Sequence, residues 1–234
     1  IDRSVRLTNP SNGKSSLITT LPVALKSIAV HPVTQAVIGV ASTGQIFEID
    51  IAAKSYSLLR DEAPNRILSV AFHPTRPEIA YGMELLNEKG LPQRGMVKLM
   101  DTQKKTILKE LTGHRAGVSS VEFSPDGELV AGAGYDRRLL LWVVDHEEDL
   151  PIVMDNNNGN VWDIAFTPDS KNLIASCNEG EVRVWPTDSR MLAELVCPKL
   201  TRNMTPEEWK LYVSRDEEKI PYENTCQSLL FKPL

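Results

Sequence analysis

Alternating apolar residues recur along the chain in a constant relation to proline. Four segments share a pattern of alternating apolar positions followed by one small or polar residue and proline, and they end at Pro32, Pro74, Pro125 and Pro168. Consecutive segments lie 42, 51 and 43 residues apart, which indicates a repeat of about 42 residues. A second apolar run follows each segment, over 44–50, 95–101, 137–142 and 180–185. The residue before proline and the last core position of the second run are 18 residues apart in three repeats and 27 in the second.

Each repeat has the pattern of four short β-strands. In the third repeat the expected strands are 118–123, 128–133, 138–143 and 150–155, and the turn residues SPDG (124–127) separate the first two. Four strands joined by tight turns form one antiparallel sheet with apolar residues on both faces. Such a sheet needs neighbours on either side, and a ring of sheets provides them. The sequence therefore predicts an all-β fold, a β-propeller of four-stranded antiparallel blades.

The repeats divide the chain into blades and a tail. Residues 1–23 fit the second half of a blade, and the whole blades are expected at about 24–64, 65–112, 113–158 and 159–200. Four full repeats plus a half repeat fall short of a seven-bladed ring, which needs about 295 residues. Residue 1 is Ile, and we expect the upstream part of the same polypeptide to complete the ring.

The tail, 201–234, differs in character from the repeats. Thr205 and Glu208 form a capping box with Pro206 at the first helical position, which predicts a helix over about 206–213. Its apolar side carries Trp209, Tyr212 and Val213 and either packs on the propeller or docks another protein. The segment 226–231 is the one strand-like part of the tail.

Composition excludes several classes of protein. The chain has 234 residues, of which 41% are hydrophobic and 24% charged, as in ordinary soluble domains. The formal net charge of −5 argues against nucleic-acid binding, and the longest apolar run is too short for a membrane span. The three cysteines are far apart and odd in number, so we expect neither a disulfide nor a zinc site. These features favour a reducing compartment and a cytoplasmic location.

The third repeat resembles the WD-repeat family. Gly113-His114, SPDG, Asp136 and Trp142 match the Gly-His and Trp-Asp signature of that family, and the resemblance covers about residues 2–197. The resemblance implies that His114, Asp136 and Trp142 form a structural tetrad with a Ser or Thr. The segment 130–135 has only Ala and Gly near that fourth position, so the network is expected to be partial. The tail is similar to endings of bacterial WD-repeat proteins.

Candidate partner-binding residues lie in the connections between strands. The additional residues of the second repeat predict a projecting loop over 83–94, whose Leu85, Leu86 and Leu91 either fold back or meet a partner. The repeat register places five more candidates on the same face of the propeller: Arg66, Tyr135, Arg137, Asn160 and Trp162. Trp162 has the alternative of packing between blades.

These patterns favour a non-catalytic protein–protein interaction scaffold or sensor module. It would bind a protein or peptide through the face carrying the d–a and b–c loops, where a to d are the strands of a blade in chain order, and would form the C-terminal part of a larger signalling or effector protein. The alternative is a propeller enzyme, a hydrolase or oxidoreductase, with its site near the central channel. The sequence shows no catalytic motif and no cofactor or metal signature. The acidic segment 145–151 fits a solvated hairpin better than a site for a hard metal ion.

Overall fold

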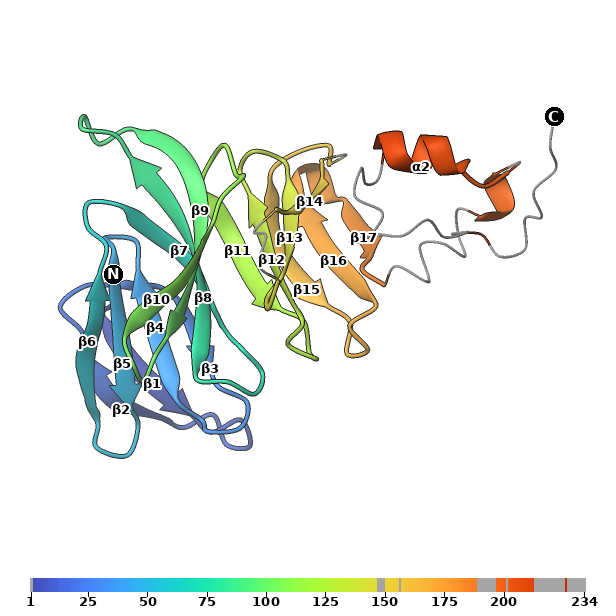
Figure 1. The fold of residues 1–234 in the computed structure, drawn as a ribbon. Coiled ribbons are helices and arrows are strands. Elements are labelled where there is room, and N and C mark those ends of the chain that lie inside the picture. Colours follow the sequence, from blue (N-terminus) through green and yellow to red (C-terminus); the bar gives the residue numbers. More distant parts are fainter. Residues whose placement is uncertain are drawn as a thin grey trace. The chain divides into compact units, whose positions relative to one another are not determined.

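The computed structural model describes residues 2–146, 150–155, 157–188, 197–200, 202–212 and 226. The chain divides into two compact units, residues 1–185 (unit 1) and 186–234 (unit 2). Unit 1 consists of five antiparallel sheets, each formed by strands that are consecutive in the sequence (Figure 1). These sheets are the predicted blades.

The blades are numbered in chain order. Blade 1 has β1 (Ser4–Thr8) and β2 (Ser15–Thr20). Blade 2 has β3 (Leu25–Val30), β4 (Val37–Ala41), β5 (Gln45–Asp50) and β6 (Ser55–Asp61). Blade 3 has β7 (Arg66–Phe72), β8 (Glu78–Leu86), β9 (Pro92–Asp101) and β10 (Thr106–Leu111). Blade 4 has β11 (Val118–Phe123), β12 (Leu129–Gly134), β13 (Leu139–Val143) and β14 (Ile152–Met154). Blade 5 has β15 (Val161–Phe166), β16 (Asn172–Cys177), the short helix η1 (Asn178–Gly180) and β17 (Val182–Pro186).

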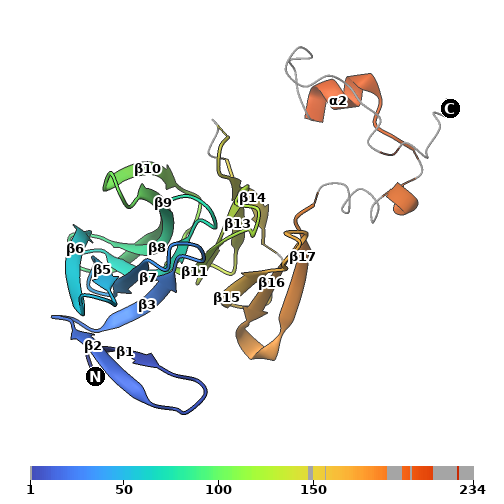
Figure 2. The same ribbon diagram turned by 90° about the horizontal axis from the view of Figure 1, so that it is seen from below.

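The strand register follows the repeat found in the sequence. In the first three repeats the last core residue of the second run pairs with the strand before it at the same repeat position, as Val37↔Ile49, Ile79↔Met100 and Val130↔Trp142. Strands β3, β7, β11 and β15 lie at the edge of their sheets and form the inner side of unit 1 (Figure 2). Each inner strand has one irregularity in its pairing, at Lys26, Leu68, Ser119 and Trp162. A bulge at the same place in four blades re-aims one side chain per blade toward the same end of unit 1.

The hydrophobic core lies between neighbouring blades. One cluster joins blades 3 and 4 through residues such as Leu99, Val121 and Trp142, and another joins blades 4 and 5 through Leu141 and Phe166. Stacking therefore buries both faces of an inner blade, as the pattern of the strands predicts.

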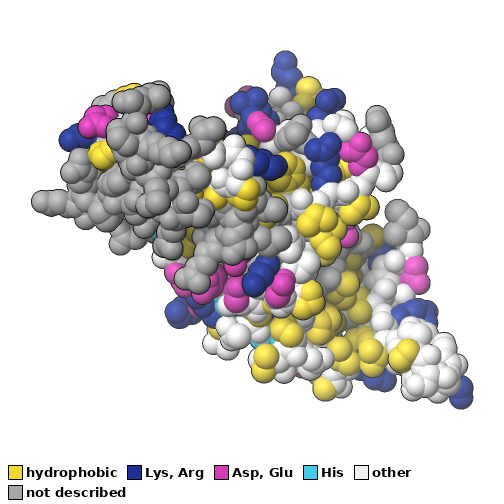
Figure 3. All heavy atoms as spheres, turned by 90° about the vertical axis from the view of Figure 1, so that its right-hand side faces the viewer, with side chains coloured by type: hydrophobic (Ala, Val, Ile, Leu, Met, Phe, Trp, Pro, Cys, Tyr) yellow, Lys and Arg dark blue, Asp and Glu magenta, His cyan; other side chains and the backbone are white. Residues whose placement is uncertain are grey.

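The ring of blades is not closed among the described residues. Hydrophobic side chains are exposed on the side that Figure 3 shows. Val182 and Val184 of β17 are 68% and 60% exposed, whereas the residues at the same positions of blade 4, Leu139 and Leu141, are buried against blade 5. The face of blade 5 that carries Val182 and Val184 thus lacks the following blade that covers the equivalent face of blade 4.

The prediction of a long loop over 83–94 is wrong at both of its ends. Residues 83–86 extend β8 and residues 92–94 extend β9, since cross-strand pairing continues through Glu84↔Gly95 to Leu86↔Pro92. Only 87–91 form the turn, where Asn87 Oδ1 accepts hydrogen bonds from two backbone N–H groups and Gly90 has φ 73°. The additional residues of the second repeat lengthen a hairpin because the apolar alternation continues on both sides of the turn.

Unit 2 contains η2 (Cys197–Lys199) and α2 (Pro206–Tyr212), which confirms a helix beginning at Pro206. The capping box is present, because Glu208 N donates to Thr205 Oγ1 and Thr205 N donates to Glu208 Oε2. Val213 and the strand-like segment 227–231 lie outside the described residues, as do 147–149 and 189–196.

The expectation of no disulfide is wrong. Cys197 and Cys226 are bonded, although 29 positions separate them in the sequence. Asn203 holds this pairing in place, since its amide exchanges two hydrogen bonds of 2.9 Å with the backbone of Cys226. A wide spacing therefore does not exclude pairing, and the argument for a reducing compartment loses its main support. Cys177 is free and buried.

Candidate partner-binding surface

Blade 4 contains the three predicted tetrad residues in contact. His114 Nδ1 lies 3.1 Å from both carboxylate oxygens of Asp136, and the His114 and Trp142 rings are 6.1 Å apart. Burial alone would raise the pKa of Asp136, but the hydrogen bonds from His114 and two backbone N–H groups hold it below its ordinary value. An ionised Asp136 only accepts, so Nδ1 of His114 carries the proton.

The fourth tetrad position in blade 4 has no hydroxyl group, because glycine stands there. Gly132 lies opposite His114 Nε2, and a Cβ built on Gly132 would be 3.1 Å from that atom. His114 Nε2 and Trp142 Nε1 are both buried without a hydrogen-bond partner. The network is partial, and these residues hold the chain that enters β11.

Blade 3 anchors its entering chain with different chemistry. Glu62 lies four residues before β7, as His114 lies four residues before β11. Its carboxylate accepts from Tyr81 Oη at 2.8 Å, forms an ion pair with Lys98 Nζ at 3.1 Å and pairs with Arg60. Burial opposes ionisation of Glu62, but these donors keep its pKa below the ordinary value. Sequence reasoning missed this cluster because blade 3 has none of the Gly-His or Trp signals.

An exposed aromatic pair lies at the end of unit 1 where the inner strands begin. Trp162, at the bulge of β15, is 51% exposed and packs edge-to-face on Tyr135 with 5.6 Å between ring centroids. Its indole Nε1 donates to Asn178 Oδ1 at 3.2 Å. Asn160, two residues earlier, accepts a backbone hydrogen bond from Asn178 through its carbonyl group. These contacts hold Trp162 in one orientation while leaving half of it in solvent.

The two charged candidates, Arg66 and Arg137, differ in the contacts that they make near this aromatic pair. Arg66 Nη1 donates to Glu84 Oε2 at 2.9 Å. A Cβ built on Gly117 would lie 2.9 Å from Glu84 Oε1, and Gly117 O accepts a hydrogen bond from Tyr135 N at 3.0 Å, so the pair of Arg66 and Glu84 lies next to the backbone that holds Tyr135. Burial and the nearby Glu84 raise the pKa of Tyr135. Arg137 is exposed beside Tyr135, and its carbonyl accepts from Asn157.

The hairpin leucines are separated from one another. Leu85 packs against the core between blades 2 and 3, Leu86 is half-buried, and Leu91 is 57% exposed in the turn. Of the candidates from the sequence, the structure brings Tyr135, Asn160 and Trp162 together, pairs Arg66 with Glu84, and leaves Leu91 at a hairpin tip.

Comparison with known proteins identifies the repeats. The sequence model of "WD domain, G-beta repeat" matches residues 105–143 and 151–186, which contain Trp142 and Trp185. The chain therefore carries WD repeats over residues 105–143 and 151–186. It is 30% identical over 133 residues to "WD repeat and SOCS box-containing protein 1" of Takifugu rubripes, covering 56% of this chain and 30% of that protein.

Two further WD-repeat relatives match shorter stretches. "Small ribosomal subunit protein RACK1" of Brassica napus is 34% identical over 84 residues, 36% of this chain and 25% of that protein. "Periodic tryptophan protein 2 homolog" of Neurospora crassa is 30% identical over 89 residues, 38% of this chain and 10% of that protein. The matched part of the chain thus spans a tenth to less than a third of these relatives. All three are eukaryotic proteins, so the comparison does not support the expected bacterial source.

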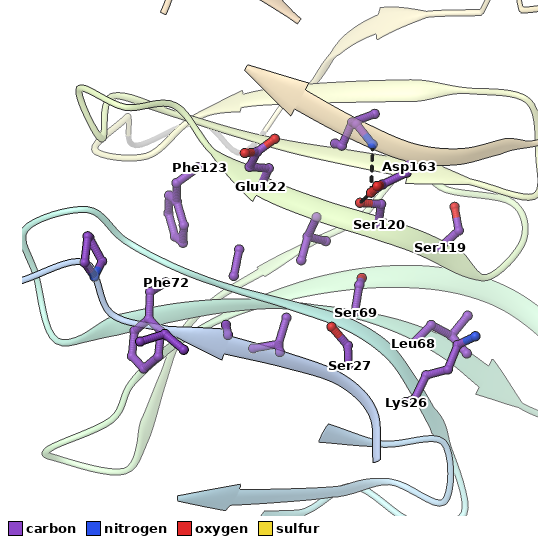
Figure 4. Close-up of a pocket in the computed structure, with 17 residues that line it drawn as sticks. Lys26, Ser27, Leu68, Ser69, Phe72, Ser119, Ser120, Glu122, Phe123 and Asp163 are labelled. Atoms are coloured by element: carbon purple, nitrogen blue, oxygen red, sulfur yellow. Dashed lines mark hydrogen bonds between the residues drawn. The ribbon is translucent and has the colours of Figure 1, made fainter. Parts of the chain in front are cut away.

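The inner strands carry two carboxylates that the sequence reasoning overlooked. Glu122 and Asp163 line a cavity beside the inner strands (Figure 4), and neither is among the candidates predicted from the sequence. The repeat register could have revealed Glu122, because it stands where the other repeats have Ala29, Ala71 and Ala165.

Among the described residues no three His, Cys, Asp or Glu side chains form a group suited to a metal ion. None of the helices in the described ranges has the length and apolarity to cross a bilayer.

Proposed function

We propose that this WD-repeat chain is a protein-interaction scaffold that binds a protein or peptide at the surface around Trp162 and Tyr135. The observation that carries the proposal is the half-exposed Trp162, oriented by Tyr135 and Asn178. Trp, Tyr and Arg are the residues that most often dominate binding energy at protein interfaces. An indole that is already ordered loses little further conformational freedom on binding.

The charged groups around the pair support a protein partner. Arg66 and Glu84 satisfy each other at the rim, whereas Arg137 has no acidic partner among the described residues. A polar rim around an aromatic centre is the usual composition of a transient interface. WD40 repeat proteins are generally non-catalytic scaffolds, which favours binding over catalysis. The enzyme alternative would need reacting groups at the inner strands, and the net charge of −5 disfavours nucleic acid.

Photo-crosslinking tests the position of the surface. A photoreactive phenylalanine replaces Trp162 in one variant and Val33 in another, since Val33 is 72% exposed and follows the opposite end of β3. We expect a partner to be captured from position 162 and not from position 33. A Tyr135→Ala change should lower that capture, because it removes the ring that packs against residue 162 and orients it. Equal capture from both positions would contradict the proposal.

We further propose that upstream residues of a larger signalling or effector polypeptide complete the ring. Val182 and Val184 lie uncovered at positions where blade 4 is covered by blade 5, which supports a following blade at this face. Hydrogen exchange in the longer polypeptide tests this idea. The amides of β17 should exchange more slowly there than in the 234-residue chain, and equal rates in both would argue against ring completion.

A further inference from the structure

Two buried histidines follow the inner strands of blades 2 and 3. His31 comes after β3 and His73 after β7, and each ring lies in the turn between strands a and b of its own blade. In each ring Nδ1 accepts hydrogen bonds of 3.0 to 3.2 Å from two backbone N–H groups of that turn, which are Val33 and Thr34 for His31 and Thr75 and Arg76 for His73. A nitrogen that accepts from two N–H groups carries no proton, so the proton of each ring is on Nε2.

The second ring nitrogen bonds the turn of the following blade. His31 Nε2 donates to the carbonyl oxygen of Arg76 in blade 3, and His73 Nε2 donates to that of Gly127 in blade 4, each at 3.2 Å. The side chain of Arg76 extends the connection, since it donates two hydrogen bonds of 2.8 and 2.5 Å to Asp145, which follows β13 of blade 4. Blades 2, 3 and 4 are therefore joined at the end of unit 1 where the inner strands end.

Ring packing fills the same two junctions. His31 packs edge-to-face on Phe72 of β7 and His73 does so on Phe123 of β11, with 5.2 and 5.1 Å between ring centroids. Figure 4 shows both phenylalanines at the same end of the inner strands. The His73 ring also lies directly on the backbone of Gly127, where φ is 78° and an added Cβ would be 2.6 Å from Nε2. Neither ring can move without opening the contact between its own blade and the next one.

Blades 4 and 5 have hydroxyl groups at the position of these histidines. Ser124 Oγ accepts from Leu129 N at 2.9 Å, and Thr167 Oγ1 accepts from Asn172 N at 3.1 Å. These turns keep their shape through groups that do not titrate in the range where histidine does. The same fold position is therefore titratable in two blades and not in the other two.

The surroundings of His73 disfavour a second proton on its ring. Burial and the guanidinium group of Arg76 hold the pKa of His73 below its ordinary value of 6.5, although Asp145 acts in the opposite direction. The other titratable or charged groups on the elements packed around this ring are His31, Glu78, Lys109 and Asp126. A proton on Nδ1 would also point at the two N–H groups that now donate to it.

We propose that His31 and His73 form an acid-sensitive latch, which joins blades 2, 3 and 4 at neutral pH and opens when Nδ1 takes up a proton. The inference goes beyond the proposed function, because the latch lies where the inner strands end and Trp162 lies where β15 begins. A released His73 ring binds more protons than a closed one below pH 6.5. The free energy that keeps the latch closed is therefore complete above that pH and is lost as the pH falls below it.

Hydrogen exchange of single amides, followed by NMR in the full chain, tests the latch. The protection factors of Thr75 and Arg76 should fall by about five- to tenfold between about pH 7.5 and pH 5.5, because opening is linked to the uptake of one proton. Those of Leu129 and Asn172, which donate to hydroxyl groups in the equivalent turns, should stay constant. Equal falls at all four amides, or no fall at any of them, would overturn the proposal.

The tautomer of the two rings is a second measurement and needs no variant. Nitrogen chemical shifts of the imidazole rings show which nitrogen carries the proton. At about pH 7.5 both His31 and His73 should carry it on Nε2, and both should become doubly protonated as the turn amides lose protection. A proton on Nδ1 of either ring at neutral pH would contradict the latch.

A variant separates the two junctions. His73→Asn removes the titrating group and keeps a side-chain oxygen that can accept from Thr75 N and Arg76 N. The protection of these two amides should then no longer change with pH, while that of Val33, which donates to His31, should still fall.

His146→Gln is the matched control, since it removes an exposed histidine next to Asp145. This change should leave the pH response of all the turn amides as in the wild type. A folded His73→Asn chain with the wild-type response at Thr75 and Arg76 would overturn the latch. If that variant does not fold, the tautomers and the amide protection of the wild type decide the question.

Discussion

Blades 3 and 4 have the same strands in the same register but hold the entering chain in different ways. In blade 4 the anchoring residue is His114, which pairs with Asp136 in the b–c turn and contacts Trp142. In blade 3 it is Glu62, which is surrounded by Tyr81, Lys98 and Arg60. The cross-strand pair Tyr81↔Lys98 stands where blade 4 has Gly132↔Leu140.

The difference shows what the blade requires at this position. In both blades a buried polar group ends the connection between blades, and its partners include residues of the blade being entered. Blade 4 does this with the imidazole of His114 and the carboxylate of Asp136, but leaves His114 Nε2 and Trp142 Nε1 without a hydrogen-bond partner. Blade 3 does this with an ionic cluster in which every polar atom of Glu62 has a donor. The fold thus depends on the position of the anchor more than on its chemical identity.

The largest expected effect is the loss of Glu62. Glu62→Ala leaves Lys98, which is 8% exposed, with Glu110 as its remaining ion-pair partner and leaves Tyr81 Oη unpaired. Removing one member of a buried ion pair costs about 3 kcal/mol of unfolding free energy. Urea unfolding of the full chain measures this loss.

A double variant is the control for Glu62. Glu62→Ala combined with Lys98→Leu introduces the leucine that blade 4 has at that position, Leu140. Removing both charges should restore about half of the lost stability, since apolar replacement of a buried pair is close to neutral. A double variant as unstable as the single one would mean that Glu62 acts through packing alone.

The second effect concerns the unpaired nitrogens of blade 4. A Cβ at Gly132 would lie 3.1 to 3.2 Å from His114 Nε2, Val97 and Trp142, so Gly132→Ala should destabilise the chain slightly. Gly132→Ser adds a hydroxyl group that can bond His114 Nε2. We expect the serine variant to be about 1 kcal/mol more stable than the alanine variant in urea unfolding. A serine variant no more stable than alanine would show that the hydroxyl group does not reach the ring.

The contrast between the blades also explains what the sequence could predict. Blade boundaries, register and the group of His114, Asp136 and Trp142 follow from hydrophobic period and motif, because both are local patterns. The cluster of Glu62, Tyr81 and Lys98 joins positions 36 residues apart in one blade through residues that no motif marks. Its members are visible only once the strand pairing shows that Tyr81 and Lys98 lie where blade 4 has Gly132 and Leu140.

Two other failures have the same origin. The length of the insertion predicts a loop over 83–94, whereas the alternation of apolar residues that continues on either side of Asn87 forms a hairpin. The Cys197–Cys226 bond was missed because pairing depends on distance in space, and Asn203 sets that distance. Glu122 could have been found, since it interrupts a column of alanines in the repeat.

The third, smaller effect is a difference in the pH dependence of stability between the wild type and the double variant. The pKa of Glu62 is lowered in the folded chain, so its contribution is complete above its unfolded value near 4.5 and is lost as the pH falls below it. Unfolding free energy should therefore fall more steeply below that pH in the wild type than in the Glu62→Ala, Lys98→Leu variant. The difference in slope is at most about 1.4 kcal/mol per pH unit. The pKa of Asp136 is also lowered, and the stability that it contributes is lost below pH 3.8 in both proteins. Equal slopes of unfolding free energy against pH in the two proteins between pH 4.5 and 3.8 would therefore contradict the role of Glu62.

The smallest effect is expected at the rim of the candidate surface, where blade 3 meets blade 4. Arg66 is 47% exposed at its side chain, and solvent screens its pair with Glu84. Arg66→Ala should lower unfolding free energy by only about 0.5 kcal/mol. As a fraction of the wild-type value, partner capture from position 162 should fall more than the unfolding free energy does, because Arg66 and Glu84 lie next to the backbone that holds Tyr135 in the proposed interface. Arg115→Ala is the matched control, since the Arg115 side chain is exposed on the neighbouring connection and forms no ion pair within the described residues, while its backbone bond to Asp136 is kept in the variant. If Arg66→Ala costs as much stability as Glu62→Ala, the pair of Arg66 and Glu84 is a second anchor of blade 3 and not part of an interaction surface.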